Sequence, residues 1–515
     1  MKQRAAFGKA AIALILLGSM AWSGCSPAQM KPDTVTDTGT AAPGETSQPT
    51  ETETGRSTYR DNLPDSLDFS GAEVRVMYRG GSLEDNNTYQ RLDVIGTDNW
   101  GDLVSDAVWD RNRAVEQRLN MTFGWIPSGA GAVACRDAIQ KSVLAQSDDY
   151  DFINTSGNTV ISSGLDGYMR DVGDMPYVDF AQPWWWRYAI DALSMDGKTI
   201  HYLFGDSQLV CFIQTGVVFY NKTLYQNLFG QSDALYDVVL DGKWTLDRMA
   251  EASEAAYSDL NGDGSRDSGD LFGTILTTNL KGEAIQYLQG FDIRTFTRDE
   301  DGILTIDFDR ERAAAAVEKL YRFLNENAGC FQTTADMNGL DSEFVKGRSL
   351  FLPGRFMHAY QGDLREMTDD YGILPFPKLE EGQKEYVTLS HNSGTVICVP
   401  ATTSDARMEY VGAVLEATMA ESYRSVVPKF IEVSLKHKYS CDEASSRTVD
   451  LIIATISKNT LDEYAVYVND IYNNVLVKAA IQSGSFASSY EKIRDAAQNS
   501  WDKAVSDMMK TGGQG

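Results

Sequence analysis

The stretch that decides the fold class starts at AEVRVMY (residues 72–78), in which every second side chain is apolar, as in a half-buried β-strand. Apolar residues at helical spacing then predict a helix from Gly101 to Asn120. MTFGWI (121–126) predicts a second strand, a helix follows over about 134–145, and YDFIN (150–154) predicts a third strand. Strands that alternate with helices in this way predict a parallel sheet with helices on its faces.

The second half of the chain repeats this alternation. Thr245 and Asn221 are suited to N-cap helices, because their side-chain oxygens can accept hydrogen bonds from the first helical turn. A strong helix is predicted over 313–324, and the chain is mostly helical from about Met408. Strands are predicted at 215–220, 349–352, 372–375 and 395–400. Since no tandem repeat occurs, we expect an α/β fold rather than a solenoid.

The whole chain is strongly acidic. Its 515 residues carry 46 Lys and Arg against 73 Asp and Glu, a formal net charge of −27. Such a charge gives no field that attracts a phosphate backbone, which argues against a nucleic-acid partner. The length suggests about three domain-sized units. No apolar run reaches the ~20 residues of a spanning helix, so the mature chain is not predicted to be an integral membrane protein.

The N-terminus has the features of an export signal. MKQR (residues 1–4) is basic, residues 10–20 are apolar, and small residues precede Cys25. This order resembles a bacterial lipoprotein signal, in which Cys25 becomes the lipidated first residue. An ordinary signal peptide that is cut elsewhere is the alternative. We therefore expect a signal peptide over 1–24 and an extracytoplasmic protein anchored to the cell membrane through Cys25.

Residues 25–66 are expected to form a disordered tether. Thr, Pro, Gly, Ser and Glu dominate this stretch as far as about Asn62, and large apolar side chains are too few to build a core. A lipidated cysteine followed by a solvated tether would hold a folded domain a short distance from the membrane.

The sequence contains no recognisable catalytic motif. The four histidines have no zinc-binding spacing, and the chain has neither a Gly-x-Ser-x-Gly elbow nor a phosphate-cradling loop. The five cysteines after Cys25 are scattered and odd in number, so they predict no disulfide framework and most should be buried. These features disfavour an enzyme, although the two carboxylates of a glycosidase could stand far apart in the sequence.

The strongest local chemical pattern is DLNGDGSRDSGD (residues 259–270). Oxygen-bearing side chains stand at calcium-loop positions 1, 3, 5, 9 and 12, Gly264 at position 6 permits the turn, and position 7 offers a main-chain carbonyl. Asp270 replaces the usual Glu at position 12. The predicted ligands of a structural Ca²⁺ are Asp259, Asn261, Asp263, Ser265, Asp267 and Asp270. An empty acidic turn is the alternative.

Five segments together resemble a known family. In chain order they are DGKTIHYL (196–203), VFYNKTL (218–224), FVKGRSLF (344–351), YGILPFPK (371–378) and ICVPAT (397–402). Their order and spacing are similar to the family 1 extracellular solute-binding proteins of bacterial ABC transporters, the group that contains maltose-binding protein. The resemblance spans about residues 70–505.

This resemblance implies a two-lobed clamp of the type II periplasmic-binding-protein fold, in which each lobe is a mixed sheet flanked by helices. The implied boundaries are 67–208 for the first part of lobe 1, 209–392 for the first part of lobe 2 with its calcium loop, 393–440 for the return to lobe 1, and 441–515 for the C-terminal helices of lobe 2. The chain would cross between lobes near 204–215, 389–395 and 436–446. Closure of such lobes on a ligand is a hinge motion that excludes water.

The family binds mostly sugars, which flat aromatic rings and planar polar groups recognise. WWW (184–186) is the most conspicuous aromatic cluster, with core packing or a structural corner as the alternative for each ring. The resemblance places Phe356 where relatives have a stacking aromatic, and Gln214 where they have a polar contact in the hinge. Arg355 could fork onto a hydroxyl pair or a carboxylate, with a surface ion pair as the alternative.

The loop after the third strand adds small and polar groups at the carboxyl end of the predicted parallel sheet, where ligands usually bind. A simple strand-to-helix turn is the alternative for that loop. The complete set of expected ligand contacts is Arg79, Asp85, Ser156, Asn158, Trp184, Trp185, Gln208, Gln214, Arg355 and Phe356.

The sequence thus predicts a binding protein rather than an enzyme. We expect a lipid-anchored, monomeric receptor of an ABC importer that captures an oligosaccharide between its lobes and delivers it unchanged to the membrane permease. The alternatives are a secreted carbohydrate-active enzyme and a cell-surface scaffold protein. The calcium loop resembles one half of a dockerin, but a dockerin needs two such loops in a short module.

Overall fold

The computed structural model describes most of the chain after residue 52. The described residues are 53–82, 90–96, 103–129, 131–277, 282–307, 309–333, 337–360, 363–390, 394–431, 443–456, 464 and 471–511. Cys25 and Asp85 lie outside these ranges, as do the signal peptide and the first part of the tether. Within the described ranges, no helix combines the length and the apolar character that a membrane span requires.

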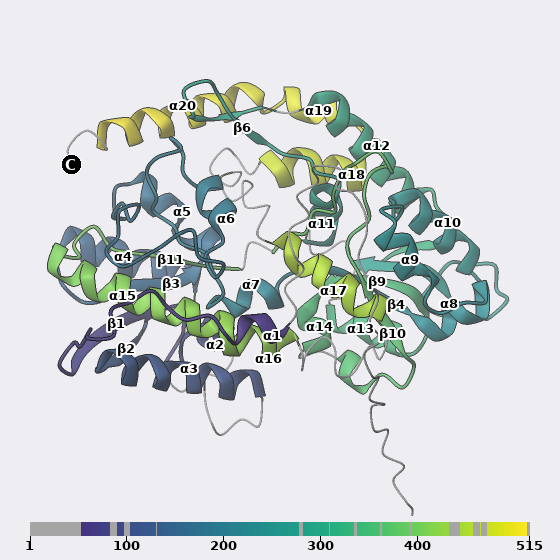
Figure 1. The fold of residues 1–515 in the computed structure, drawn as a ribbon. Coiled ribbons are helices and arrows are strands. Elements are labelled where there is room, and N and C mark those ends of the chain that lie inside the picture. The colour runs from purple at the N-terminus through teal and green to yellow at the C-terminus, as the bar shows by residue number, and fades with distance from the viewer. Residues whose placement is uncertain are drawn as a thin grey trace, which may run out of the picture. The chain divides into compact units, whose positions relative to one another are not determined.

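The first sheet has the strand order β11-β3-β1-β2. Its strands are β1 (Ala72–Tyr78), β2 (Met121–Pro127), β3 (Phe152–Ser156) and β11 (Thr395–Cys398). β1 runs parallel to β2 and β3, which confirms the predicted parallel arrangement, and β11 runs antiparallel to β3. Helices α3 (Leu103–Leu119) and α4 (Ala132–Leu144) connect the parallel strands, and α15 (Asp405–Glu421) packs on α3 (Figure 1).

The second sheet has the strand order β10-β4-β9-β5-β8. Its strands are β4 (Gly216–Asn221), β5 (Phe272–Thr277), β8 (Cys330–Thr333), β9 (Ser349–Arg355) and β10 (Tyr371–Leu374). β5 is parallel to β8 and β9, whereas β4 is antiparallel to β9 and β10. The mixed sheets and their covering helices confirm the predicted α/β class.

Helices begin where the sequence predicts N-caps. Thr245 Oγ1 and Asn221 Oδ1 accept main-chain hydrogen bonds at the starts of α10 (Leu246–Ala256) and α8 (Lys222–Phe229), respectively. The remaining described helices and strands are α1 (Glu53–Arg56), α2 (Gln90–Val94), α5 (Gly157–Leu165), α6 (Arg187–Ala192), α7 (Leu209–Ile213), α9 (Ala234–Leu240), α11 (Gly282–Gly290), β6 (Phe296–Arg298), β7 (Leu304–Ile306), α12 (Arg310–Asn325), α13 (Met337–Val345), α14 (Phe356–Tyr360), η1 (Asp363–Glu366), η2 (Ser422–Val426), α16 (Val427–Phe430), α17 (Glu443–Ile456), η5 (Tyr472–Val477), α18 (Lys478–Gln482), α19 (Phe486–Glu491) and α20 (Arg494–Thr511).

Helix α10 packs on the second sheet with its backbone in close contact with two glycines. A Cβ atom at Gly273 would lie 2.0 Å from Ser253 Cα, and one at Gly329 would lie 1.8 Å from Ser253 O. Any larger residue at either position would push the helix off the strands, so glycine is required by this close approach.

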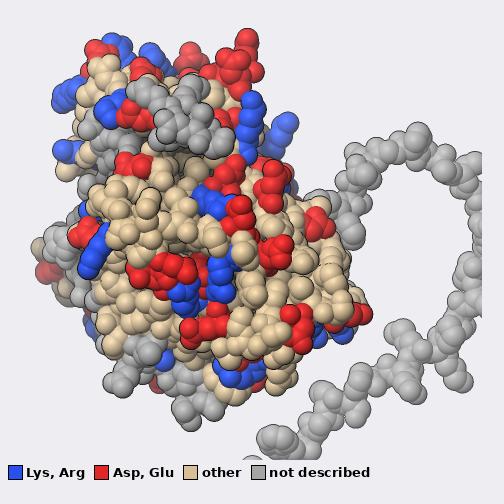
Figure 2. Space-filling model, turned by 90° about the vertical axis from the view of Figure 1, so that its left-hand side faces the viewer, with Lys and Arg blue, Asp and Glu red and all other residues tan. Residues whose placement is uncertain are grey.

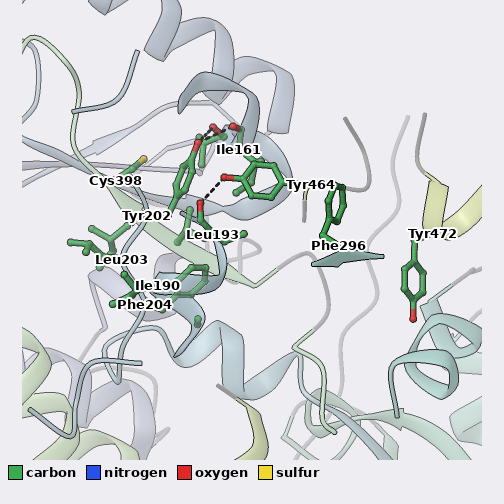
Figure 3. Packing of buried hydrophobic residues seen from close by; sticks show 14 of the residues in the cluster. Ile161, Ile190, Leu193, Tyr202, Leu203, Phe204, Phe296, Cys398, Tyr464 and Tyr472 are labelled. Atoms are coloured by element: carbon green, nitrogen blue, oxygen red, sulfur yellow. Dashed lines mark hydrogen bonds between the residues drawn. The ribbon is translucent and has the colours of Figure 1, made fainter. Parts of the chain in front are cut away.

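Buried phenols tie distant parts of the chain into the core. Tyr464 Oη donates a hydrogen bond to Leu193 O at 2.6 Å, and Tyr202 Oη donates one to Ile161 O at 2.8 Å, as Figure 3 shows. Both tyrosines are buried, and a buried hydroxyl needs a partner of this kind. Tyr464 thereby attaches the C-terminal region to the segment that follows α6.

Two of the implied crossing segments, 204–215 and 389–395, are paired at or next to their described ends. Leu203 pairs with Ile397, and Thr215 pairs with Ser390, both as antiparallel bridges. The first segment contains α7 and joins the first sheet to β4, while the second leads into β11.

The end of the expected tether has a defined structure, which corrects the prediction that disorder extends to residue 66. Arg56 lies over the ring of Tyr423 at 4.4 Å, and the rings of Tyr59 and Tyr423 meet edge to face at 5.4 Å. Composition alone could not predict these contacts. They are made by single aromatic and basic residues within a polar stretch, and their partner is far away in the sequence.

The surface carries both signs of charge. On the face shown in Figure 2, clusters of acidic side chains lie beside Lys and Arg side chains, and apolar and neutral residues separate them. This face therefore offers no broad basic patch for a polyanion, in keeping with the acidic composition.

Candidate functional site

The first sheet ends in a polar pair at its carboxyl edge. Arg79 directly follows β1, and its Nη1 donates a hydrogen bond to Ser156 Oγ, at the end of β3, at 3.0 Å. Ser156 in turn is the register partner of Thr395, where the second crossing segment enters β11. Asn158 lies in the first turn of α5, and its side chain is outside the described part of the structure. The edge can thus offer a guanidinium and a hydroxyl to a ligand.

The second sheet has a polar pair where the first crossing segment enters β4. Arg355 Nη1, at the end of β9, donates a hydrogen bond to Gln214 Oε1 at 2.9 Å. Gln214 is buried, and Arg355 is 9% exposed. The sequence analysis singled out both residues separately, and the structure brings them together. Thr215, next to Gln214, pairs with Ser390, and Ser156 pairs with Thr395, so the two polar pairs adjoin the two described ends of the second crossing segment, 389–395.

The predicted aromatic contacts have the placement of core residues. Phe356 is completely buried and meets Phe430 edge to face at 6.4 Å, and Trp184 is completely buried as well. Trp185 is 4% exposed, and its Nε1 donates to Glu416 Oε2 at 2.8 Å. A sugar-stacking ring needs an open face, so the burial of Trp184 and Trp185 favours the alternative of core packing, and the buried Phe356 presents no open face for stacking.

The side-chain amide of Gln208 forms hydrogen bonds with main-chain groups of three residues. Its Oε1 accepts from Gly205 N at 2.6 Å, and its Nε2 donates to Leu203 O at 3.2 Å and to Thr395 O at 2.8 Å. The buried amide therefore joins the two crossing segments, and its hydrogen-bonding groups are already engaged there.

Sequence reasoning missed a buried carboxylate beside the crossings. Asp93 of α2 accepts hydrogen bonds from Val210 N at 2.8 Å, from Asn154 Nδ2 at 3.4 Å and from Thr395 Oγ1. Burial raises the pKa of Asp93 to about 7, against the lowering effect of these three donors. One side chain thus links α2, β3, α7 and β11.

Sequence reasoning also missed two other buried ionisable groups, Arg111 beside this network and Glu416 on α15. Arg111 of α3 donates to Asp93 O at 2.7 Å and to Ser422 Oγ at 3.3 Å, and burial lowers the pKa of its guanidinium to about 10. Burial raises the pKa of Glu416, the partner of Trp185, to about 7. In the sequence, a charged residue within an apolar run, such as Asp93 in LDVI (92–95), could have indicated a buried charge.

The predicted calcium loop is held by its own main-chain amides. Asp259 accepts from Gly262 N at 2.6 Å and from Gly264 N at 3.0 Å, and Asp263 accepts from Ser265 N at 2.7 Å. Asp270 is buried and accepts from the amides of Leu260 and Asp267, both at 3.3 Å. Gly262 and Gly264 adopt positive φ angles, as the turn requires.

As placed, these loop side chains do not converge on one point. Within the described ranges, no three His, Cys, Asp or Glu side chains are arranged to hold a metal ion. Asn261 and Asp267 likewise accept from amides within the loop, Asp263 N at 2.9 Å and Gly269 N at 2.7 Å.

The described cysteines agree with the expectation of buried small residues. Cys135, Cys211, Cys330 and Cys398 are all buried and in the thiol form. Burial raises the pKa of Cys211 to about 12, so this thiol stays protonated and unreactive at neutral pH.

Comparisons with known proteins show similarity in structure alone. No family model and no curated sequence matches the chain. The maltose/maltodextrin-binding domain of Bdellovibrio bacteriovorus, bound to maltotriose, has a TM-score of 0.51 at 13% identity and covers 84% of this chain and 100% of its own. A sugar transporter structure from Rhizobium etli in an open conformation has a TM-score of 0.52 at 14% identity, with 82% and 99% covered.

A third solved structure is similar to the same degree. The galacto-N-biose/lacto-N-biose I-binding protein of the Bifidobacterium longum ABC transporter, in complex with lacto-N-biose, has a TM-score of 0.51 at 13% identity, with 86% and 98% covered. These neighbours are binding proteins rather than enzymes. The chain therefore has the two-lobed α/β fold of the periplasmic-binding-protein type, the fold of the sugar-binding proteins of ABC transporters.

Proposed function

We propose that the protein captures a carbohydrate between its two sheets and releases it chemically unchanged. The observation that carries this proposal is the position of the two polar pairs, Arg79 with Ser156 and Arg355 with Gln214, at the edges of the two sheets and beside Thr395 and Ser390 of the second crossing segment. A ligand that contacts both pairs favours the closed arrangement of the lobes, which is a shift of population rather than a reaction. The fold shared with sugar-binding proteins supports the same ligand class.

The proposed contacts match the chemistry of a sugar. The guanidinium groups of Arg79 and Arg355 present forked N–H donors to pairs of hydroxyl oxygens, and the Gln214 amide adds a neutral donor and acceptor. Hydroxyl groups both donate and accept, so this mixed set suits them better than it suits a simple ion. We assign the ligand to the oligosaccharides.

The proposal extends to the place of action. Cys25 would carry the lipid, and the tether would hold a monomeric, extracytoplasmic receptor near an ABC permease that takes up the released sugar. Support comes from the lipoprotein-like signal and from the kind of protein that shares this fold. Retention of the wild type, but not of Cys25→Ala, in the membrane fraction would test the anchor.

We further propose that residues 259–270 bind Ca²⁺ in a structural role. The spacing of oxygen-bearing side chains and the positive φ angles at Gly262 and Gly264 support this proposal. Binding would draw the carboxylates of Asp259, Asp263 and Asp267 away from their present hydrogen-bond partners in the loop and toward the ion, so that they would repel one another less. The loop lies apart from the two polar pairs, between α10 and β5.

The decisive experiment for the main proposal is a thermal-shift screen of the mature chain. The panel contains maltose, maltotriose, lacto-N-biose, xylobiose and cellobiose, each at millimolar concentration. A ligand that binds only the folded protein raises the Tm, and the same sugar should reduce the radius of gyration in solution scattering. If no sugar shifts the Tm, the proposal fails, and hydrolysis of a panel member would indicate an enzyme instead.

A further inference from the structure

Both polar atoms of the buried Gln286 amide, Oε1 and Nε2, lack a hydrogen-bond partner within the part of the chain that the structure describes. Gln286 lies on α11 and is 2% exposed. Leaving a buried amide unpaired destabilises the folded protein, because its bonds to water are lost without replacement. Such an arrangement needs a reason other than stability.

A second buried glutamine of the same half shows the usual arrangement. Gln383 Oε1 accepts from Leu379 N at 3.2 Å, and its Nε2 donates to Gly290 O at 2.8 Å and to Glu385 O at 2.9 Å. The fold therefore does satisfy a buried glutamine amide close to the end of α11, and Gln286 differs from it in having every group unused.

The position of Gln286 connects it to the candidate site. Its amide covers Gly216, the first residue of β4, where an added Cβ would lie 2.8 Å from the Gln286 side-chain carbon Cδ. Gly216 is the antiparallel register partner of Arg355. Directly paired residues of a sheet project to the same face, so the Arg355 side chain leaves β9 on the face that Gln286 covers.

Three polar side chains therefore gather around the start of β4. Gln214, two residues before Gly216, is bonded to Arg355, and Gln286 completes the group from the overlying helix. We propose that Gln286 contacts the ligand at this site. The carbonyl oxygen and the NH2 group of its side-chain amide would hydrogen-bond to adjacent hydroxyls of a saccharide. A hydroxyl pair that both accepts and donates is the complement of a side-chain amide.

This inference rests on the proposed function and deepens it, because it assigns a hydroxyl-specific contact on the side of the second sheet. The test compares Gln286→Met, which keeps the length of the side chain and removes its polar atoms, with the matched control Gln383→Met. The probe is whichever sugar of the panel gives the wild type its largest Tm shift, and affinity is measured by calorimetric titration of folded protein.

Loss of one or two hydrogen bonds to the sugar should weaken the affinity of Gln286→Met by about 10-fold or more. In the absence of sugar its Tm should equal or exceed that of the wild type, because an unpaired amide has been removed. Gln383→Met should do the opposite, with a lower Tm and an unchanged affinity.

Wild-type affinity in Gln286→Met overturns the assignment, and so does a drop in its sugar-free Tm as large as that of the control. A wild type that binds no panel sugar is a different result, since it refutes the proposed function itself and the inference with it.

Discussion

Arg56 Nη1 lies 3.5 Å from Oδ2 of the buried Asp206, so a residue near the end of the expected tether pairs with a carboxylate in the first crossing segment. The other carboxylate oxygen of Asp206 accepts from Trp186 Nε1 at 2.7 Å. Because Arg56 also lies over the ring of Tyr423 in η2, it connects the N-terminal segment, the crossing and the short helical segment that follows α15.

Replacing Arg56 by Ala should destabilise the fold by about 2 kcal/mol, since it leaves the Asp206 charge buried with weaker compensation and removes a cation–π contact. Urea unfolding at pH 7.5 measures the change. Arg60→Ala is the matched control, because Arg60 bonds to the carbonyls of Ser57 and Tyr59 within its own segment. Equal effects of the two substitutions would mean that the Arg56 contact contributes nothing specific.

Three buried carboxyls predict that the fold is more stable at pH 5 than at pH 8. Burial raises the pKa of Asp206 to about 6 and those of Asp93 and Glu416 to about 7. Between about pH 4 and 7 the unfolded chain releases these protons while the folded chain keeps them, so stability falls as the pH rises. Above pH 7 the full cost of burying the charges remains.

Asp206→Asn should flatten part of this profile. The shift of the Asp206 pKa from 3.8 to about 6 corresponds to about 3 kcal/mol of lost stability at pH 8. The variant avoids this cost, and its amide oxygen can still accept from Trp186. Chemical unfolding between pH 4.5 and 8 checks the expectation. Parallel profiles for variant and wild type would show that Asp206 does not titrate in this range.

The fold was largely predictable from the sequence, because its signals are local. The alternation in β1 and the helical spacing over α3 set the parallel sheet, and side-chain caps at Thr245 and Asn221 marked helix starts. By contrast, the pairing of β11 with β3 could not be deduced, since strands so far apart in the chain are brought together by tertiary packing.

The site was only partly predictable. Arg79, Ser156, Gln214 and Arg355 were identified at strand ends, but their pairing depends on register and on the path of the crossings. The tryptophan-rich stretch 184–186 left ligand contact and core packing open, because such a stretch is equally suited to a core, and the burial of Trp184 and Trp185 favours the core. The buried charges were missed, because burial of an isolated polar residue leaves only a weak mark in the sequence.

Gln208→Leu should cost about 3 kcal/mol in stability. The substitution removes three buried hydrogen bonds and leaves the amide of Gly205 unpaired, while Leu203 O keeps its bond from Ile397 N and Thr395 O keeps its bond from Cys211 Sγ. Differential scanning calorimetry should show a lower Tm. Gln226→Leu is the control, because Gln226 is exposed and braces only its own turn through Gly230 O and Ser232 N. A Tm loss no greater than that of the control would contradict the bracing role.

Removal of calcium by a chelator should lower the Tm of the wild type and leave the Tm of Asp263→Ala unchanged. Asp263 is exposed and accepts only from amides and the Asn261 side chain of its own loop, so its removal leaves the core intact. Asp301→Ala, in the exposed acidic turn 299–302, should respond to EDTA as the wild type does. A chelator response that survives in Asp263→Ala would place the ion elsewhere.

Arg355→Lys should weaken sugar binding by about 10-fold while the fold is retained. Lysine keeps the positive charge but offers a single point of donation, so it cannot bond to Gln214 and to a hydroxyl pair at once. Arg348→Lys is a suitable control, because Arg348 precedes β9 and donates outward to Ser268 O at 2.8 Å. Calorimetric titration with the best panel sugar measures both variants. If Arg355→Lys binds as tightly as the control, the guanidinium fork does not contact the ligand, and the pair with Gln214 serves the fold alone.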